Sequence, residues 1–261
     1  MRLNPFNTNN INVRSSGGGV PGGKAGGIGC GTIVIAAIGY FVFGLDPMQT
    51  AGMVEGVQQG QQQAGPANTD EQEVCTSSEY ALEACNGLQS LNQTWAATFD
   101  AQGYGDQFQQ PTLDLYGGGG VRTGCGNGTS AMGPFYCPAD QTIYIDTSFY
   151  DTLERQLGAG GDFARYYVLA HEYGHHIQTI TGISGQIRSA QQQNPSRANQ
   201  LQVLMELQAD CYAGVWAGKN RNLIEPGDIE EGMEAAAAIG DDRLTGGRVS
   251  SENFTHGTSQ Q

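Results

Sequence analysis

The sequence predicts an α+β domain preceded by one transmembrane helix. Three observations lead to this fold class. Uncharged, mainly apolar residues run from 28 to 45, a short β-branched and aromatic strand pattern occupies 142–146, and long helical patterns fill the second half of the chain. A short sheet followed by long helices is typical of α+β domains rather than of folds in which strands and helices alternate.

The apolar run at 28–45 is long enough to cross a bilayer as a helix. The only charges that precede it are Arg2, Arg14 and Lys24, and all 26 acidic residues follow it. Because basic flanks stay on the cytoplasmic side, we expect a single-pass inner-membrane protein with a cytoplasmic N-terminus and a periplasmic or otherwise extracytoplasmic folded domain. A buried core helix and a cleaved signal peptide are the alternatives, although no convincing A-x-A cleavage site is present.

Composition divides the 261 residues into four parts. Residues 1–24 are rich in Asn, Gly and Ser, which predicts a disordered cytoplasmic tail. The transmembrane anchor occupies 25–45, and a Gln- and Gly-rich flexible linker occupies 46–73. The folded domain then covers 74–261. The net charge of -14 excludes the basic face that a nucleic-acid-binding protein needs, so no nucleic-acid partner is expected.

Within the folded domain, apolar spacing predicts four helices and one strand. Capping and stop residues set their limits, with Asp162 as an N-cap, Asn194-Pro195 opening a helix, and Gly182 and Gly218 as stops. The predicted elements are a helix at 79–99, a strand at 142–146, and helices at 162–178, 194–216 and 228–239.

The cysteines fit an exported domain. Cys75 and Cys85 are ten residues apart, and Cys125 and Cys137 are twelve apart in a Gly- and Pro-rich stretch. Two local disulfides suit an oxidising compartment, although spacing alone does not fix connectivity. We predict a Cys125–Cys137 bridge and a Cys75–Cys85 bridge. Cys211 is then left over, either as a buried thiol or with a partner that this chain lacks.

Residues 171–175 read His-Glu-Tyr-Gly-His. This spacing places His171 and His175 on one helix face, where both can bind one Zn²⁺ while Glu172 faces the metal-bound water. Zinc lowers the pKa of that water, and Glu172 can take its proton and hand it to the leaving amine. Incidental histidines on a surface helix are the alternative, but two of only four histidines fall at this spacing.

A catalytic zinc needs a third protein ligand and one open position. Glu206 and Asp210 share one face of an apolar helical pattern, where an acidic pair is costly unless it is satisfied. A zinc ligand at Glu206 and a carboxylate at Asp210 that orients a ligand histidine would satisfy both. A solvated helix face is the alternative. Among the other histidines, His176 is expected to pack or lie on the surface, and His256 is a loop candidate.

These motifs resemble the bacterial neutral zinc metallopeptidases, which are HExxH-type, zincin-like, single-pass membrane proteins. The resemblance covers about residues 95–261 and the layout of tail, anchor and tether. It implies a zincin-like fold with a short sheet and long active-site helices, with His171, His175 and Glu206 as zinc ligands and Glu172 as catalytic base. It also implies a domain truncated at its C-terminus, because family members continue past this point. The resemblance rests on the blocks at 124–126, 132–138, 143–146, 171–178, 205–216, 239–243 and 254–257.

We therefore expect a membrane-anchored zinc metalloendopeptidase that acts on peptide or protein substrates and contacts membrane lipid through its N-terminal helix. His256 should lie near the zinc and donate a hydrogen bond to the oxyanion. The strand at 143–146 should be a sheet edge that borders the zinc cleft and pairs with the substrate. A deformylase-like amide hydrolase with Cys125 as a ligand is one alternative. A non-catalytic, zinc-stabilised interaction domain is another, and the intact Glu172 argues against it.

Overall fold

The computed structural model describes residues 1–16, 68–117, 120–244, 246–248 and 253–261. The predicted anchor at 25–45 lies outside these residues, and none of the described helices is long and apolar enough to cross a membrane. The strands are β1 (Val13–Arg14), β2 (Thr112–Tyr116), β3 (Val121–Thr123), β4 (Gly126–Gly128), β5 (Phe135–Cys137) and β6 (Thr142–Asp146). The α-helices are α3 (Glu71–Cys75), α4 (Glu79–Ala101), α5 (Ser148–Arg155), α6 (Asp162–Ile180), α7 (Ile183–Gln193), α8 (Ala198–Lys219), α9 (Asp228–Ala238) and α10 (Asp241–Leu244).

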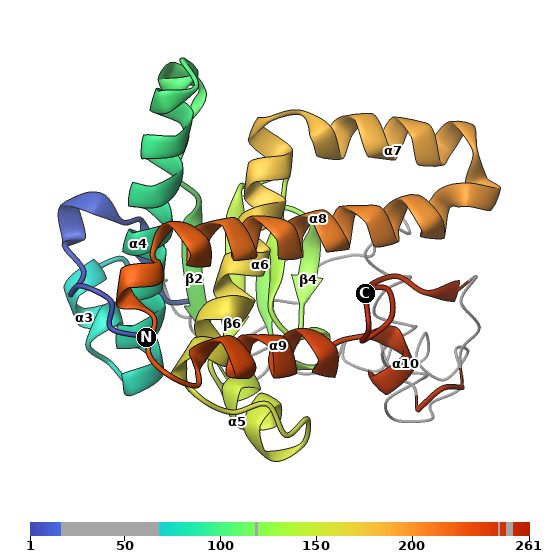
Figure 1. Cartoon of the computed structure of the whole chain (residues 1–261). Coiled ribbons are helices and arrows are strands. Elements are labelled where there is room, and N and C mark those ends of the chain that lie inside the picture. The colour runs from blue at the N-terminus through green and yellow to red at the C-terminus, as the bar shows by residue number, and fades with distance from the viewer. Residues whose placement is uncertain (17–67, 118–119, 245, 249–252) are drawn as a thin grey trace, which may run out of the picture.

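Small sheets and long helices make up an α+β architecture, as the sequence predicts. Figure 1 shows α6 running through the middle of the molecule, with α8 crossing it and α4 at one end. Helix α7 folds back antiparallel to α8, and α9 runs alongside α8 and also crosses α6. Almost every side of α6 is buried, because the sheet, α4, α8 and α9 all pack against it. The helix that carries both motif histidines is therefore the central element of the core.

The main sheet has the order β1-β2-β6-β5. Strands β1, β2 and β6 are parallel, and β5 pairs antiparallel with β6. All five residues of β6 are buried, as a strand covered on both faces and paired on both edges requires. The prediction that residues 143–146 form a sheet edge is therefore wrong, since β6 lies inside the sheet. The edge strand beside α6 is β5, and β3 and β4 form a separate hairpin.

The N-terminal segment belongs to the fold. Strand β1 pairs with β2, and Ile11 and Val13 are 3% and 4% exposed within the main core. The predicted disordered tail over 1–24 is therefore wrong for residues 1–16. The composition of residues 1–24 is dominated by Asn, Gly and Ser, so the two core residues Ile11 and Val13 do not stand out in it. Strand β1 has only two residues, which is too short to give an alternating pattern. The remainder of that predicted tail, residues 17–24, lies outside the described residues.

The two ends of the segment 17–67 meet on the domain. Ser15 and Asn68 form an antiparallel bridge with two backbone hydrogen bonds of 2.8 Å each. The neighbouring Arg14 places its guanidinium 2.6 Å from the buried carboxylate of Asp114 on β2. These contacts hold residues 13–16 on the same body as residue 68.

Both predicted disulfides are present. Cys75–Cys85 joins α3 to α4, and Cys125–Cys137 joins the β3–β4 turn to β5. Cys211 is unpaired among the described residues and exposed on α8, so it is not the buried thiol that was one alternative. The bridge at Cys125 removes the thiolate that a deformylase-like metal site would need.

The predicted helix limits differ from the structure mainly at the termini. Helices α4 and α9 and strand β6 match to within two residues. Asp162 is the first residue of α6 rather than its N-cap, which is Gly161. The Asn194-Pro195 pair opens a 3₁₀ turn before α8 begins, and α8 continues through Gly218 to Lys219. A Cβ at Gly218 would meet nothing within 4 Å, so an exposed glycine there only weakens the helix without ending it.

Candidate metal centre

Two helices bring the motif residues together. His171 and His175 lie one turn apart on α6, with ring centroids 4.9 Å from each other. Glu206 lies on α8, which crosses α6 at this point (Figure 1). All three ligand atoms lie within 4.8 Å of one another. The three residues predicted as metal ligands are therefore brought together by the fold.

Two small residues, Gly174 of α6 and Ala209 of α8, allow the two helices to approach this closely. Gly174, between the two histidines, faces Ala209 of α8, and a Cβ on Gly174 would lie 2.9 Å from the Cα and from the carbonyl oxygen of Ala209. That distance is shorter than an ordinary carbon contact. Only glycine therefore fits at position 174 while α8 stays where it is, which explains the glycine inside the motif.

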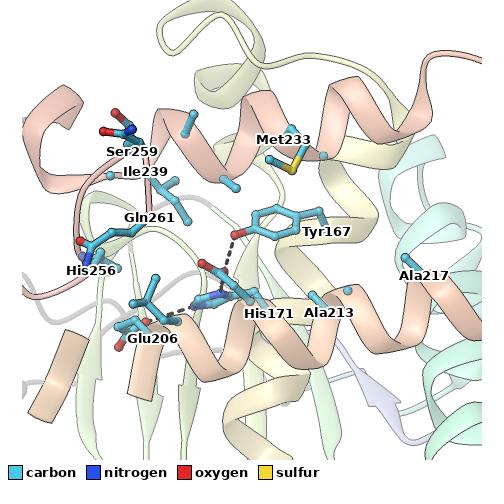
Figure 2. A pocket seen from close by; sticks show the side chains of 18 of the residues that line it. Tyr167, His171, Glu206, Ala213, Ala217, Met233, Ile239, His256, Ser259 and Gln261 are labelled. Carbon is cyan, nitrogen blue, oxygen red and sulfur yellow. Dashed lines mark hydrogen bonds and ion pairs between the residues drawn. The ribbon is translucent and has the colours of Figure 1, made fainter. Parts of the chain in front are cut away.

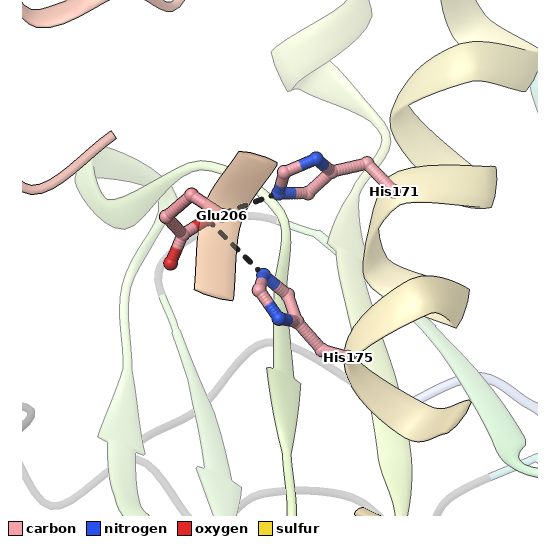
Figure 3. Close-up of side chains that lie close together, drawn as sticks. All are labelled: His171, His175 and Glu206. Carbon is pink, nitrogen blue, oxygen red and sulfur yellow. Dashed lines mark hydrogen bonds and ion pairs between the residues drawn. The ribbon is translucent and has the colours of Figure 1, made fainter. Parts of the chain in front are cut away.

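The two imidazoles turn the same ring nitrogen toward the same oxygen. Nε2 of His171 and Nε2 of His175 are each 3.2 Å from Oε2 of Glu206. Figure 3 shows both rings pointing away from α6 toward the carboxylate. The other carboxylate oxygen of Glu206, Oε1, accepts a hydrogen bond of 2.7 Å from the Gln202 side chain one turn earlier on α8. Gln202 thereby fixes which oxygen faces the histidines.

Outer partners fix the orientation of both rings. Nδ1 of His171 is 2.7 Å from Oδ1 of Asp210, which also accepts a hydrogen bond from the hydroxyl of Tyr167. Nδ1 of His175 is 2.9 Å from Oε1 of Gln178. The amide nitrogen of Gln178 donates to the carbonyl of Met205 and to the Gln208 side chain on α8, so its oxygen must face His175.

The donor chemistry fits a divalent metal ion. An ionised Asp210 and the oxygen of Gln178 only accept hydrogen bonds, so both histidines carry their proton on Nδ1 and direct the Nε2 lone pair inward. Glu206 also directs an acceptor oxygen to the same point. Three acceptors this close repel one another unless a cation or protons lie between them. Two imidazoles and one carboxylate form the ligand set of many catalytic zinc sites.

Electrostatics favour an anionic Glu206. Burial alone would raise its pKa, but when the motif histidines are protonated on Nε2 as well, the charge of His175 and hydrogen bonds from both histidines hold the pKa well below its usual range. For His171, burial alone would lower the pKa, but hydrogen bonds with Asp210 and Glu206 raise it well above the usual value. The carboxylates of Glu206 and Asp210 therefore make the centre negative, and this favours a proton or a cation at the histidine nitrogens.

Glu172 lies beside the three ligands without belonging to the set. Its side chain is on the buried helix α6, and the residue is 8% exposed. Burial raises its pKa above the usual range, and the charges of His175 and His171 only partly offset this. A raised pKa makes this carboxylate a stronger proton acceptor than an exposed one, as a general base requires.

His256 lines the same pocket as His171 and Glu206 (Figure 2). Asp241 holds the His256 loop by accepting backbone N–H bonds from Thr255, His256 and Gly257. Its Oδ1 is also 3.6 Å from Nδ1 of His256. Burial alone would raise the pKa of Asp241, but the hydrogen bonds from His256 and Thr255 lower it. His256 is thus fixed by a charged partner at the side of the centre.

Several of these partners are not evident from the sequence. Tyr167, Gln178 and Gln202 have no special pattern, although each lies three or four residues from a residue that it contacts or supports. His176 follows the motif but faces away from it. It is fully buried, with Nε2 2.7 Å from the carbonyl of Gln109 and Nδ1 3.1 Å from the hydroxyl of Tyr136. It is a packed histidine, as the sequence predicts.

A second acidic group needs no metal. Asp162, Asp228 and Glu231 bring their carboxylates within 4.8 Å of one another. The amino group of Met1 lies 2.8 Å from Asp162 and 3.0 Å from Asp228. Its positive charge partly offsets the three negative charges, so this partly buried cluster is an ion-pair network that joins the N-terminal segment to α6 and α9.

Comparisons with known proteins agree with the geometry. Residues 3–261 match the family described as "Putative neutral zinc metallopeptidase". The uncharacterised protein YpfJ of Escherichia coli (strain K12) is 46% identical over 248 residues, which are 93% of this chain and 81% of YpfJ. The uncharacterised protein Rv2575 of Mycobacterium tuberculosis (strain ATCC 25618 / H37Rv) is 45% identical over 170 residues, which are 59% of this chain and 56% of Rv2575. No solved structure matches the chain significantly. The family match spans almost the whole sequence, and the chain therefore belongs to the neutral zinc metallopeptidase family.

Proposed function

We propose that the protein is an HExxH-type zinc metalloendopeptidase that hydrolyses peptide bonds in peptide or protein substrates. His171, His175 and Glu206 would hold the zinc ion. When bound, the zinc would act as a Lewis acid that lowers the pKa of a water molecule and polarises the substrate carbonyl.

One observation carries this proposal. The Nε2 atoms of His171 and His175 both face Oε2 of Glu206 at 3.2 Å, and each ring is turned that way by a separate partner. Asp210 holds the first ring and Gln178 holds the second. Metal-ligating histidines in proteins usually have such partners on their other nitrogen. Two histidines that share a helix face by chance are not expected each to have an acceptor on Nδ1 that turns Nε2 toward the same oxygen.

The chain's own residues supply the remaining chemistry. Glu172 would take the proton from the attacking water and deliver it to the nitrogen of the leaving amine, so that one water and one amide give a carboxylic acid and an amine. His256, held by Asp241, would donate a hydrogen bond to the oxygen that becomes negative during the attack. Tyr167 and Asp210 would keep His171 in the ligating tautomer.

We also propose an exported domain that is attached to the inner membrane through the apolar run at 28–45. The two disulfides support an oxidising compartment. A cytoplasmic N-terminus is not part of this proposal, because β1 (Val13–Arg14) pairs with β2 in the main sheet of the domain. The N-terminal segment would therefore lie on the domain's side of the membrane.

Metal analysis of the purified full chain, combined with an unbiased peptide-library digest, tests the function. The proposal expects one zinc per chain and cleavage that stops on chelation and returns with zinc. A chain that binds zinc but cleaves nothing in the library would instead support the zinc-stabilised interaction domain. A chain that binds no zinc would contradict both functions.

A further inference from the structure

An apolar pocket adjoins the metal centre. It lies between α8 and α9, is closed at one end by residues 258–261, and has a volume of about 240 Å³. Figure 2 shows Ala213 and Ala217 of α8 on one side of this space and Met233 of α9 on the other, with His171 and Glu206 at the end near the metal centre. Two proposed zinc ligands are thus also walls of the pocket.

The lining combines a buried aromatic floor with small residues. Phe163 and Trp216 are 5% and 1% exposed, and their rings stack with centroids 6.2 Å apart. Ala213 on α8 and Ala236 on α9 have no side chain beyond Cβ, which leaves the space open. At the rim, Met233 is 66% exposed, so an apolar side chain there has no cover from the described residues.

The pocket offers little to a charged side chain. Among the described residues no Lys or Arg lines it, and its carboxylates, Glu206 and Asp210, are both engaged with His171. A charged group that enters would lose hydration against the apolar walls, and only the polar residues near His256 and at 258–261 could partly replace it. An aliphatic or aromatic side chain would instead bury its surface against the floor, with a gain that increases with apolar area.

We propose that this pocket binds a large aliphatic or aromatic side chain of the substrate, at a residue next to the scissile bond. The inference rests on the proposed peptidase function. The position follows from the shared walls: a side chain seated against His171 and Glu206 belongs to a residue whose peptide bond reaches the metal. The substrate class is therefore peptides with Phe, Leu or a similar residue beside the cleaved bond.

Gly214 provides a variant that fills the pocket without disturbing the fold. It lines the pocket on the same face of α8 as Leu207, seven residues earlier. A Cβ at Gly214 would meet nothing within 4 Å, and the same holds for Gly218, one turn further along α8 and outside the pocket. Gly214→Leu therefore obstructs the pocket, and Gly218→Leu, at another exposed position of the same helix, is its matched control.

The test measures binding rather than turnover. Two dipeptide hydroxamates that differ only in a Phe or an Ala side chain are titrated calorimetrically into the zinc-loaded full chain. The parent should bind the Phe compound at least about tenfold more tightly, which is the discrimination typical of an apolar pocket. Gly214→Leu should abolish this preference while leaving the Ala compound within about threefold of the parent. Gly218→Leu should keep the preference, and thermal unfolding should show both variants folded.

The possible failures are distinguishable. If the parent binds both hydroxamates equally, or if Gly214→Leu retains the Phe preference, the pocket is not a substrate site and the inference is overturned. If neither compound binds the parent, the zinc-peptidase proposal itself fails. If Gly214→Leu only converts a dimer into a monomer in sedimentation experiments and leaves the preference intact, the groove is a contact between two copies, and this also overturns the inference.

Discussion

Replacing Gly174 by Ala would separate the two helices that build the metal centre. The added Cβ would lie 2.9 Å from the backbone Cα and carbonyl oxygen of Ala209. Carbon atoms pack best at 3.5–4.0 Å, so α8 would have to move by about 0.6 Å or more. The contact is with backbone rather than with a flexible side chain, so no rotamer change can relieve it.

The change in unfolding free energy on Gly174→Ala is the cost of overpacking minus the gain in helix propensity. Overpacking of this kind costs about 1–3 kcal/mol, and exchanging glycine for alanine inside a helix returns about 1 kcal/mol. The net loss is up to about 2 kcal/mol, which lowers the melting temperature by up to about 8 °C for a domain of this size. Metal sites tolerate distance changes of only about 0.2 Å. Zinc affinity should therefore fall by at least about tenfold, more than stability alone would suggest.

Zinc affinity, measured by competition with a chromophoric chelator, and thermal unfolding of the metal-stripped chain test this prediction. Gly218→Ala on α8 is the control, because a Cβ there would meet nothing within 4 Å. The control should bind zinc like the parent and be equally or slightly more stable. If Gly174→Ala also binds zinc like the parent, the close contact between α6 and α8 does not set the ligand geometry and the reasoning is refuted.

Three further predictions concern the partners of the site and the N-terminal segment. Asp210→Asn should weaken zinc binding by about 10–100-fold in the same competition assay, because His171 loses its charged partner, and unchanged affinity would contradict that role. The depressed pKa of Asp241 means that its stabilising effect is complete above the unfolded value of 3.8 and is lost as the pH falls through the folded value. The melting-temperature difference between the parent and Asp241→Asn should accordingly be widest at neutral pH and shrink below pH 3.8, and a pH-independent difference would count against it. A cysteine at the exposed Asn4, in a variant without other accessible thiols, should react with an impermeant maleimide on intact spheroplasts, whereas labelling only after lysis would place it in the cytoplasm.

Local patterns identify much of this fold. The spacing of apolar residues gives α4 and α9, the β-branched run gives β6, and the short Cys separations give both disulfides. The histidine pair and Glu206 are also predictable, because helical spacing fixes which residues share a face. In each case the information lies within one element or one short loop.

The remaining features depend on contacts between distant segments. Strand β1 is defined by its pairing with β2, about a hundred residues away, and two apolar residues in an Asn-rich stretch do not reveal that partner. The position of β6 inside the sheet depends on β5 and β2 taking its two edges. Gln178 becomes a partner of His175 only because α8 supplies acceptors for its amide nitrogen. The role of Gly174 likewise depends on Ala209 of the crossing helix.

The most direct test of the central claim compares Glu172→Gln with Glu206→Gln in the same assay. Zinc content per chain and the rate of peptide cleavage are measured on the same preparations. Glu172→Gln should keep its zinc and lose roughly two to four orders of magnitude in rate, because it lacks only the base. Glu206→Gln should lose zinc, because a ligand has been weakened. Loss of zinc from Glu172→Gln with retention in Glu206→Gln would contradict the assignment of ligand and base.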